Sequence, residues 1–282
     1  MEQARQFCVI GYPLGHTMSP PIHKRLFALS GDSRAQYGVR EIPPEALKSE
    51  AELLLKTMTG FNVTIPHKLG IMDSLTHLDE TARRYGAVNV VDCRTKTGYN
   101  TDVVGFTRAV QGIGGSLKGR VLLLGCGGAG RMMAIETAFS GGGLTMAVRE
   151  SDLPAAQALQ AEIDEKVPGA AVDVTTLDNI CGEFDLLCNA TPVGMYPHDD
   201  ACPVGEDVIA RCGCVFDAVY NPHETVLIKT AHRLGKQAAG GMAMLVWQAV
   251  AAHEIWDNAS YSPSDIQALI QEMGERVQAD FR

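Results

Sequence analysis

The segment VLLLGCGGAGR, residues 121–131, decides the fold class. Its four apolar residues predict a strand, and glycines follow at G-x-G-x-x-G spacing before a helix-compatible segment, residues 131–140. Gly125 permits the tight turn, Gly127 lets backbone approach a pyrophosphate, and Gly130 lets helix and strand pack closely. The helix N-terminus adds free N–H donors and a positive dipole end. We therefore expect dinucleotide binding by Gly125, Gly127, Gly128, Ala129 and Gly130.

A second apolar strand follows the predicted helix, at residues 144–148, and ends at Arg149 and Glu150, where a Rossmann domain reads the adenosine ribose. Helix and strand patterns then alternate through residue 234, with the last strand expected at Val215–Tyr220, which predicts a parallel sheet. Two alternatives for the glycine segment alone are a turn without a ligand and a turn that binds S-adenosylmethionine.

The composition is that of a globular protein with room for two domains. The chain has 282 residues, 46% hydrophobic and 20% charged. Its net charge of −9 argues against a nucleic-acid or anionic-membrane partner, because like charges repel. The first fifteen residues lack the apolar run of a signal peptide or a membrane span. We expect a cytoplasmic protein with a small-molecule substrate, as a monomer or homodimer.

The cysteines and histidines do not form a metal motif. No two of the eight cysteines are spaced as C-x-x-C, and several lie in apolar strand-like runs, which favours reduced structural thiols. A zinc site from Cys202, Cys212 and Cys214 would lack standard ligand spacing. His253-Glu254 resembles the start of H-E-x-x-H, but Asp257 stands where the second histidine is needed. We expect no metal.

The first candidate substrate site follows a strand expected at residues 7–10. Ser19 precedes two prolines and an amphipathic segment, so it is predicted to be the N-cap of a helix. Thr17 and Ser19 then place two hydroxyls at a helix N-terminus, where they would hold a carboxylate or simply cap the helix.

Three further polar groups stand where apolar strands end. In GFNVTIPHK, Phe61, Val63 and Ile65 alternate with polar residues, and Lys68 follows the strand, where open α/β sheets place reactive groups. Asn89 is the single polar residue of an apolar strand and needs partners that a ligand hydroxyl would supply. Asp102 leads into a helix, where it can cap and also bind a polyol.

These motifs, in this order, resemble the shikimate dehydrogenase family, including its quinate-using members. The resemblance covers nearly the whole chain and implies that Lys68 and Asp102 are catalytic, Thr17 and Ser19 hold the substrate carboxylate, and Thr64 and Asn89 touch substrate. It assigns Tyr220 and Gln248 to substrate, and Thr191, Ala218 and Gly241 to cofactor.

The resemblance also implies the domain organisation. An α/β substrate domain, residues 1–104 and 242–282, would be completed by the C-terminal helices, and a Rossmann dinucleotide-binding domain, residues 105–241, would be inserted into it. The implied activity is reversible NAD(P)-dependent reduction of 3-dehydroshikimate to shikimate, with Lys68 as general acid and base. Alternatives are a quinate/shikimate dehydrogenase that uses NAD in catabolism, and a non-catalytic metabolite or cofactor sensor.

Two departures from the family pattern bear on specificity. Thr17 stands where shikimate-specific members usually have Ser, and its methyl group changes the space around ring carbon 1, which carries a hydroxyl in quinate. At the ribose-reading position, Arg149 can pair with a 2′-phosphate, whereas Glu150 and Asp152 would repel it and accept hydrogen bonds from a free 2′-hydroxyl. The sequence slightly favours NADP over NAD.

Overall fold

The computed structural model describes residues 5–15 and 17–280. The chain forms two compact units. Unit 1 comprises Met1–Gly105 and Val246–Met273, and unit 2 comprises Phe106–Leu245 and Gly274–Arg282. Each unit contains a six-stranded sheet. This architecture confirms the predicted α/β fold class.

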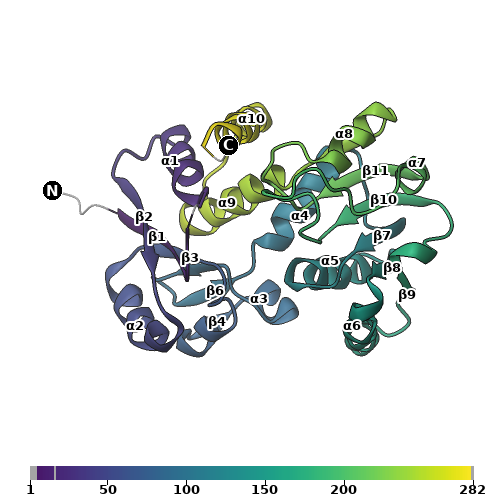
Figure 1. The fold of residues 1–282 in the computed structure, drawn as a ribbon. Helices are drawn as coiled ribbons and strands as arrows, with labels where there is room; N and C mark the ends of the chain where they lie inside the picture. Colours follow the sequence, from purple (N-terminus) through teal and green to yellow (C-terminus); the bar gives the residue numbers. More distant parts are fainter. Residues whose placement is uncertain (1–4, 16, 281–282) are drawn as a thin grey trace. The chain divides into compact units, whose positions relative to one another are not determined.

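Unit 2 is built on a parallel sheet with strand order β12-β11-β10-β7-β8-β9. Figure 1 labels β7 to β11 of this sheet. Counted along the chain within this sheet, the order is 6-5-4-1-2-3, that of a Rossmann fold, and the order reverses between β7 and β10. The strands are β7 (Arg120–Leu124), β8 (Gly143–Val148), β9 (Val172–Thr176), β10 (Phe184–Asn189), β11 (Cys212–Asp217) and β12 (Gln237–Ala239).

Helices contact both halves of this sheet. Helices α5 and α6 pack on β7, β8 and β9 (Figure 1). Helices α7 and α8 pack on β11, and α8 also packs on β12. The apolar side chains of β7, β10 and β11 are buried against them, with Leu122, Leu187 and Val215 fully inaccessible, so the sheet is a rigid support for the loops at its ends. The four helices are α5 (Gly128–Phe139), α6 (Leu153–Lys166), α7 (Glu206–Ala210) and α8 (Val226–Arg233).

Unit 1 has a mixed sheet with strand order β2-β1-β3-β5-β6-β4. β1 pairs in parallel with β2 and β3, whereas β5 is antiparallel to β3 and β6. The strands are β1 (Arg5–Gly11), β2 (Ala35–Glu41), β3 (Gly60–Val63), β4 (His77–Leu78), β5 (Val90–Asp92) and β6 (Thr97–Tyr99).

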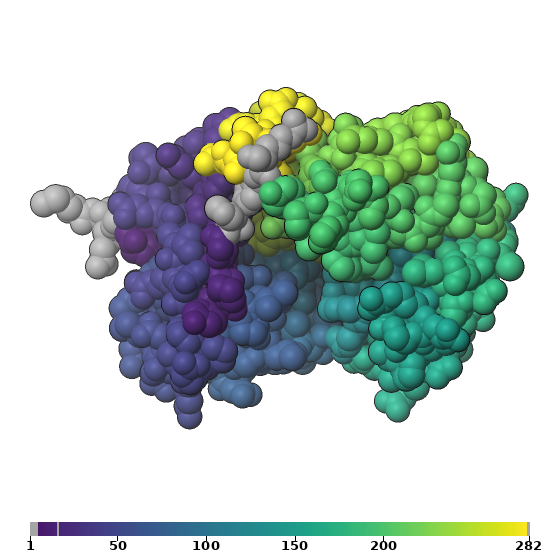
Figure 2. Space-filling view, in the orientation of Figure 1, coloured from purple at the N-terminus to yellow at the C-terminus, as the bar shows by residue number. Residues whose placement is uncertain are grey.

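Both faces of the unit 1 sheet carry apolar clusters. One cluster includes Ile10, Phe61 and Leu54 of α2 (Leu47–Thr57), a helix at the surface of unit 1 in the blue-violet region of Figure 2. The other packs Trp256 of α9 (Gly241–Asp257) against Phe7, with ring centroids 4.8 Å apart. The remaining helices are α1 (Ser19–Leu29), α3 (Glu80–Tyr85), α4 (Asp102–Gly112) and α10 (Pro263–Asp280).

Three local expectations were wrong. Met18, not Ser19, is the N-cap of α1, because the helix begins one residue earlier than the Ser-Pro pattern suggests. The alternation in GFNVTI fails as well: Asn62 is buried and Ile65, which lies beyond β3, is 74% exposed. β11 ends at Asp217, before Tyr220, and β12 follows it as a short edge strand that has no distinctive hydrophobic pattern.

Candidate active site

Lys68 and Asp102 form an ion pair in unit 1. The Lys68 ammonium donates to Asp102 Oδ2 at 2.5 Å, and the two side chains are 29% and 22% exposed. Lys68 follows β3, and its backbone carbonyl accepts a hydrogen bond from the N–H of Val88. Asp102 is the first residue of α4. A charged donor that is held in place and still reaches solvent is suited to proton transfer.

Asn89 connects this pair to the rest of the site. Its amide nitrogen lies 2.8 Å from Asp102 Oδ1 and 3.4 Å from Gln248 Oε1, and its amide oxygen accepts from the backbone N–H of Thr101 at 2.7 Å. Asn89 and Gln248 are 3% and 7% exposed. The structure therefore brings four sequence-predicted residues, Lys68, Asn89, Asp102 and Gln248, into one hydrogen-bonded cluster within unit 1.

The two hydroxyls near the start of α1 lie at a partly exposed position. Thr17 Oγ1 accepts from the backbone N–H of Ser19 at 3.3 Å, so Thr17 takes part in the capping that was expected of Ser19. The Ser19 hydroxyl bonds instead to the phenol of Tyr37, which donates to Asn62 Oδ1 at 2.6 Å. The amide of Asn62 reaches the carbonyl of Asn89 at 3.4 Å, so these contacts link Ser19 to the Lys68 cluster.

Thr64 lies where β1 and β3 end. Its backbone N–H bonds to the Ile10 carbonyl, and its methyl group lies 2.6 Å from where a Cβ would stand on Gly11. Any larger residue at position 11 would displace Thr64, which explains the glycine at the end of β1.

The glycine turn of unit 2 fits a dinucleotide pyrophosphate. Gly125 has φ of +88°, and a Cβ on Gly130 would stand 2.4 Å from the Gly125 carbonyl oxygen, so both positions require glycine. A Cβ on Gly127 or Gly128 would meet no atom of the described residues within 4 Å, and Gly127 gives α5 no side-chain cap there. The first N–H groups of α5 are thus open to an anion.

At the end of β8, Arg149 is engaged with an acidic neighbour. Its Nε donates to Asp152 Oδ2 at 2.8 Å, and Arg149 is 75% exposed. Asp152 also raises the pKa of Cys126 in the glycine turn, after the larger effect of burial, so its carboxylate lies near the turn. Because the pair is exposed, a bound phosphate can compete for Arg149 at small cost.

Of the remaining predicted residues, Thr191 follows β10, Ala218 and Tyr220 follow β11, and Gly241 begins α9 after β12. Thr191 packs its methyl group toward Gly125, and the Gly241 N–H donates to the Val219 carbonyl, next to Ala218 and Tyr220. Burial raises the pKa of Tyr220. Two fully buried residues that the sequence reasoning missed, Asn189 and Asp217, end β10 and β11. The signal was available, since each is a polar residue at the end of an apolar strand, as Asn89 is.

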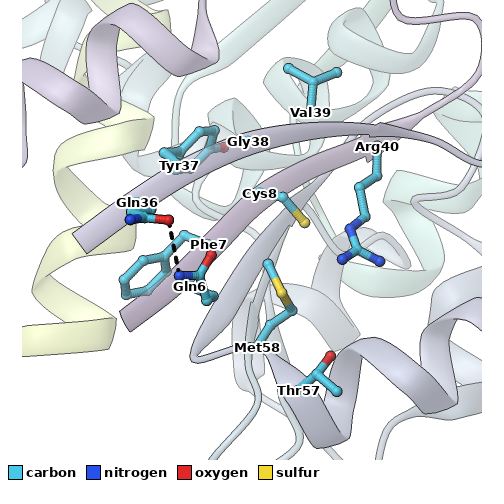
Figure 3. A pocket seen from close by; sticks show the side chains of 10 residues that line it. All are labelled: Gln6, Phe7, Cys8, Gln36, Tyr37, Gly38, Val39, Arg40, Thr57 and Met58. Carbon is cyan, nitrogen blue, oxygen red and sulfur yellow. Dashed lines mark hydrogen bonds between the residues drawn. The ribbon is translucent and has the colours of Figure 1, made fainter. Parts of the chain in front are cut away.

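A separate pocket of unit 1 lies beside β1 and β2, and no sequence-predicted site residue lines it (Figure 3). Gln6 and Gln36 close one side with a 3.1 Å hydrogen bond, and Cys8 lies at its base. Burial raises the pKa of Cys8 to about 12, so this thiol stays protonated at neutral pH. The pocket therefore presents no thiolate.

Within residues 5–15 and 17–280, no group of three His, Cys, Asp or Glu side chains could hold a metal ion. Over the same residues, no helix combines the length and apolarity that crossing a bilayer requires.

The fold and these side chains define the class of dehydrogenases that use a nicotinamide dinucleotide. Unit 2 has the Rossmann glycine turn, and unit 1 has a lysine–carboxylate pair beside amides that can bind hydroxyls. Residues 9–91 match the family described as shikimate dehydrogenase substrate binding domain. A shikimate dehydrogenase (NADP(+)) of Caldanaerobacter subterraneus subsp. tengcongensis is 35% identical over 89% of this chain and 90% of its own. The chain belongs to the shikimate dehydrogenase family.

Solved structures agree with this assignment. A shikimate 5-dehydrogenase from Thermus thermophilus, in complex with NADP(H) and shikimate, is 30% identical, with a TM-score of 0.83 over 95% of this chain and 99% of its own. A shikimate 5-dehydrogenase from Listeria monocytogenes, in complex with shikimate and NAD, is 26% identical, with a TM-score of 0.85 over 95% of this chain and 96% of its own.

Proposed function

We propose that this protein is an NADP-dependent shikimate dehydrogenase that reversibly reduces 3-dehydroshikimate to shikimate. The observation that carries the proposal is the Lys68–Asp102 ion pair. The Asn89 amide donates to Asp102 and lies within hydrogen-bond distance of Gln248, so the four polar side chains form one cluster. A ring with adjacent hydroxyls matches this set, since amides and a carboxylate can accept and donate to several hydroxyls at once. The family relationship supports the same substrate.

Each residue of unit 1 has a distinct role in this proposal. Lys68 gives a proton to the carbonyl oxygen during reduction and takes it back during oxidation, while Asp102 orients the ammonium. Asn89 and Gln248 position the ring hydroxyls, and Thr64 contacts the ring. Thr17 and Ser19 hold the carboxylate, with help from the start of α1.

In unit 2, the bound nicotinamide would supply or accept the hydride. The open backbone of Gly127, Gly128 and Ala129 would hold the pyrophosphate, next to Gly125 and Gly130. Arg149 would turn from Asp152 to the 2′-phosphate, because a doubly charged phosphate is the stronger partner. Thr191, Ala218 and Gly241 would support the nicotinamide end, with Tyr220 assigned to substrate.

A second candidate function is NAD-dependent oxidation of quinate and shikimate. Glu150 and Asp152 flank Arg149, and two carboxylates near the ribose disfavour a 2′-phosphate and can accept from a free 2′-hydroxyl. The methyl group of Thr17, which Ser would lack, also changes the space around ring carbon 1, the carbon that bears the extra hydroxyl of quinate.

The deciding experiment crosses shikimate and quinate with NADP and NAD, followed by absorbance of the reduced nicotinamide. We expect the highest kcat/KM with shikimate and NADP. A higher value with quinate and NAD would establish the second candidate instead. If none of the four combinations turns over while shikimate or a dinucleotide still binds by calorimetry, the protein is a sensor, and the enzymatic proposal is wrong.

A further inference from the structure

Two buried polar residues lie side by side at the ends of neighbouring strands in unit 2. Asn189 ends β10 and Asp217 ends β11, the two are paired in register, and both are 0% exposed. β10 and β11 are adjacent in the sheet of unit 2 (Figure 1). Nothing in the reaction proposed above uses either side chain.

Asp217 accepts three hydrogen bonds. Oδ1 accepts from Asn189 Nδ2 at 2.9 Å and from the Val219 N–H at 3.0 Å, and Oδ2 accepts from the Thr225 hydroxyl at 2.6 Å. Burial nevertheless raises the pKa of Asp217 above its ordinary value, although these bonds lower it. A buried carboxylate is an inefficient way to stabilise a sheet, since an apolar residue would pack without the desolvation cost. Its contacts therefore point to a role in the loops.

One arm of the network leads to the glycine turn. Asn189 Oδ1 accepts from the Thr191 N–H at 3.0 Å and from its hydroxyl at 2.7 Å, which fixes the Thr191 side chain. The Thr191 methyl group then lies 2.8 Å from the Cβ position of Gly125. The rotamer of Thr191 is thus set by Asn189, and Asn189 is oriented by Asp217.

The other arm leads to the loops after β11 and β12. Asp217 fixes the Val219 N–H, and the Val219 carbonyl accepts from Gly241 at 3.0 Å. The Ala218 N–H donates to the Asn189 carbonyl at 2.8 Å, and a Cβ on Gly241 would stand 2.1 Å from the Ala218 carbonyl oxygen. Besides Arg149, three cofactor residues were expected outside the glycine turn. These three, Thr191, Ala218 and Gly241, are each linked to this carboxylate through Asn189 or Val219.

We propose that Asp217 is a positioning residue for the dinucleotide site, acting through Asn189 on Thr191 and through Val219 on Ala218 and Gly241. The inference rests on the proposed function only in requiring a nicotinamide dinucleotide as the ligand. Asp217 acts as a hydrogen-bond acceptor, and its net charge is not required. The hydrogen bonds of Asp217 lie within unit 2, where Tyr220, which follows Val219, is the residue assigned to substrate in the same loop.

The test uses Asp217→Ala and Asp217→Asn in the full chain, with the Kd of NADPH measured by its fluorescence and the Kd of shikimate by calorimetry. Asp217→Ala leaves three buried donors without their acceptor. We therefore expect the NADPH Kd of this variant to rise by roughly tenfold or more, and its shikimate Kd to stay within about twofold of the parent value. In Asp217→Asn, the amide oxygen still accepts from Asn189 and Val219. The new amide NH₂ group donates to the Thr225 hydroxyl oxygen, which thereby changes from donor to acceptor in this bond. We expect this variant to remain within about threefold of the parent NADPH Kd.

Thr137→Val is the matched control, because Thr137 is as buried in α5 of the same unit and bonds only locally, to the Met133 carbonyl at 2.8 Å, among the contacts of the described residues. It should leave both Kd values unchanged. An NADPH Kd in folded Asp217→Ala equal to that of the parent would overturn the proposal, as would an equal loss in Asp217→Asn and Asp217→Ala.

If circular dichroism shows that Asp217→Ala does not fold, the pH dependence of the NADPH Kd of Asn189→Asp tests the proposal instead. Two carboxylates at this spacing resist ionising together, so they share a proton at low pH and repel one another once both are ionised at high pH. Cys202, a titratable neighbour of Asp217, stays neutral because burial, and then the Asp217 carboxylate, raises its pKa. The ratio of variant to parent NADPH Kd should rise from pH 6 to pH 9, and a flat ratio would refute the proposal.

These results are separable from the proposed function. A parent protein that binds NADPH but does not oxidise shikimate contradicts the proposed reaction and leaves the Asp217 test intact. If the parent binds NADH alone, the same titrations with NADH apply. A parent that binds neither dinucleotide contradicts both.

Discussion

Lys68 is the residue whose removal most directly tests the chemistry. Its ammonium is paired with Asp102 and remains partly exposed, whereas substrate recognition is spread over several other side chains. We expect Lys68→Ala to lower kcat by roughly 10² to 10⁴, the range for a lost general acid or base, with a change in shikimate Kd of only a few-fold. Steady-state rates and calorimetry measure the two quantities.

Lys56→Ala is the matched control, because Lys56 is an exposed lysine in the last turn of α2. It should retain the parent kcat and shikimate Kd. If Lys68→Ala also kept most of its turnover, Lys68 would not be the proton-transfer group.

At the scale of single residues, sequence reasoning identified the polar groups better than their partners. Lys68, Asn89 and Asp102 were recognised as polar side chains where apolar strands end, and the structure brings them together. Tyr37, which links Ser19 to Asn62, was not recognised, because one tyrosine in a strand carries no local sign of a contact 25 residues away.

In the turn between β7 and α5, we expect alanine substitutions at Gly130 and Gly127 to have different effects. A Cβ on Gly130 would stand 2.4 Å from the Gly125 carbonyl oxygen, whereas one on Gly127 meets nothing within 4 Å in the described parts of the chain. We expect Gly130→Ala to destabilise unit 2 by about 1–3 kcal/mol, the cost of overpacking, and to weaken NADPH binding. Gly127→Ala should cost under about 1 kcal/mol and still weaken binding, because its methyl group meets the pyrophosphate.

Thermal unfolding and NADPH titration of both variants separate these effects. Gly128→Ala serves as an internal comparison, since its Cβ position is equally open. Equal losses of stability in Gly127→Ala and Gly130→Ala would show that the backbone contact at Gly130 is not the constraint that the geometry indicates.

At the scale of elements, long periodic segments were predicted well and short or edge elements poorly. β7, β8 and α5 were expected within a few residues of their bounds. β12 and the two-residue β4 were not expected, because a short edge strand forms by pairing with a neighbour and needs no hydrophobic alternation of its own.

For the molecule as a whole, the most informative feature for stability is a buried histidine pair in unit 1. His23 Nδ1 lies 3.0 Å from His253 Nε2, His23 stacks on Tyr37 with centroids 4.2 Å apart, and Tyr261 bonds to His253 Nδ1 at 2.9 Å. Burial lowers the pKa of His23 well below 6.5 and that of His253 to about 3, assisted by their mutual repulsion at His23 and by Arg5 at His253.

These shifts set the direction of the pH dependence. Below pH 6.5 the unfolded chain protonates both histidines while the folded chain keeps them neutral, so the unfolded state binds more protons and stability falls as pH falls. Each histidine contributes up to about 1.4 kcal/mol per pH unit, or roughly 3 kcal/mol for the pair between pH 6.5 and pH 5.

Urea unfolding followed by tryptophan emission measures this effect in unit 1, where both tryptophans of the chain, Trp247 and Trp256, are located. We expect the free energy of unfolding to be steady from pH 8 to pH 7 and to drop from pH 6.5 to pH 5. His253→Gln cannot titrate and should show about half the slope. A parent curve that is flat over this range would mean that the pair is protonated in the folded state.

The sequence by itself determined the Rossmann unit, the family and most of the polar residues that the structure brings into one cluster, because these depend on local features: glycine spacing, apolar strands and polar groups at strand ends. Only the tertiary structure decided which groups are partners. The Lys68–Asp102 pair spans 34 positions, Asn89–Gln248 spans 159, and Asn189–Asp217 joins the ends of two strands. Such contacts arise from sheet order and helix packing, which bring distant segments to one edge, and no local pattern encodes them.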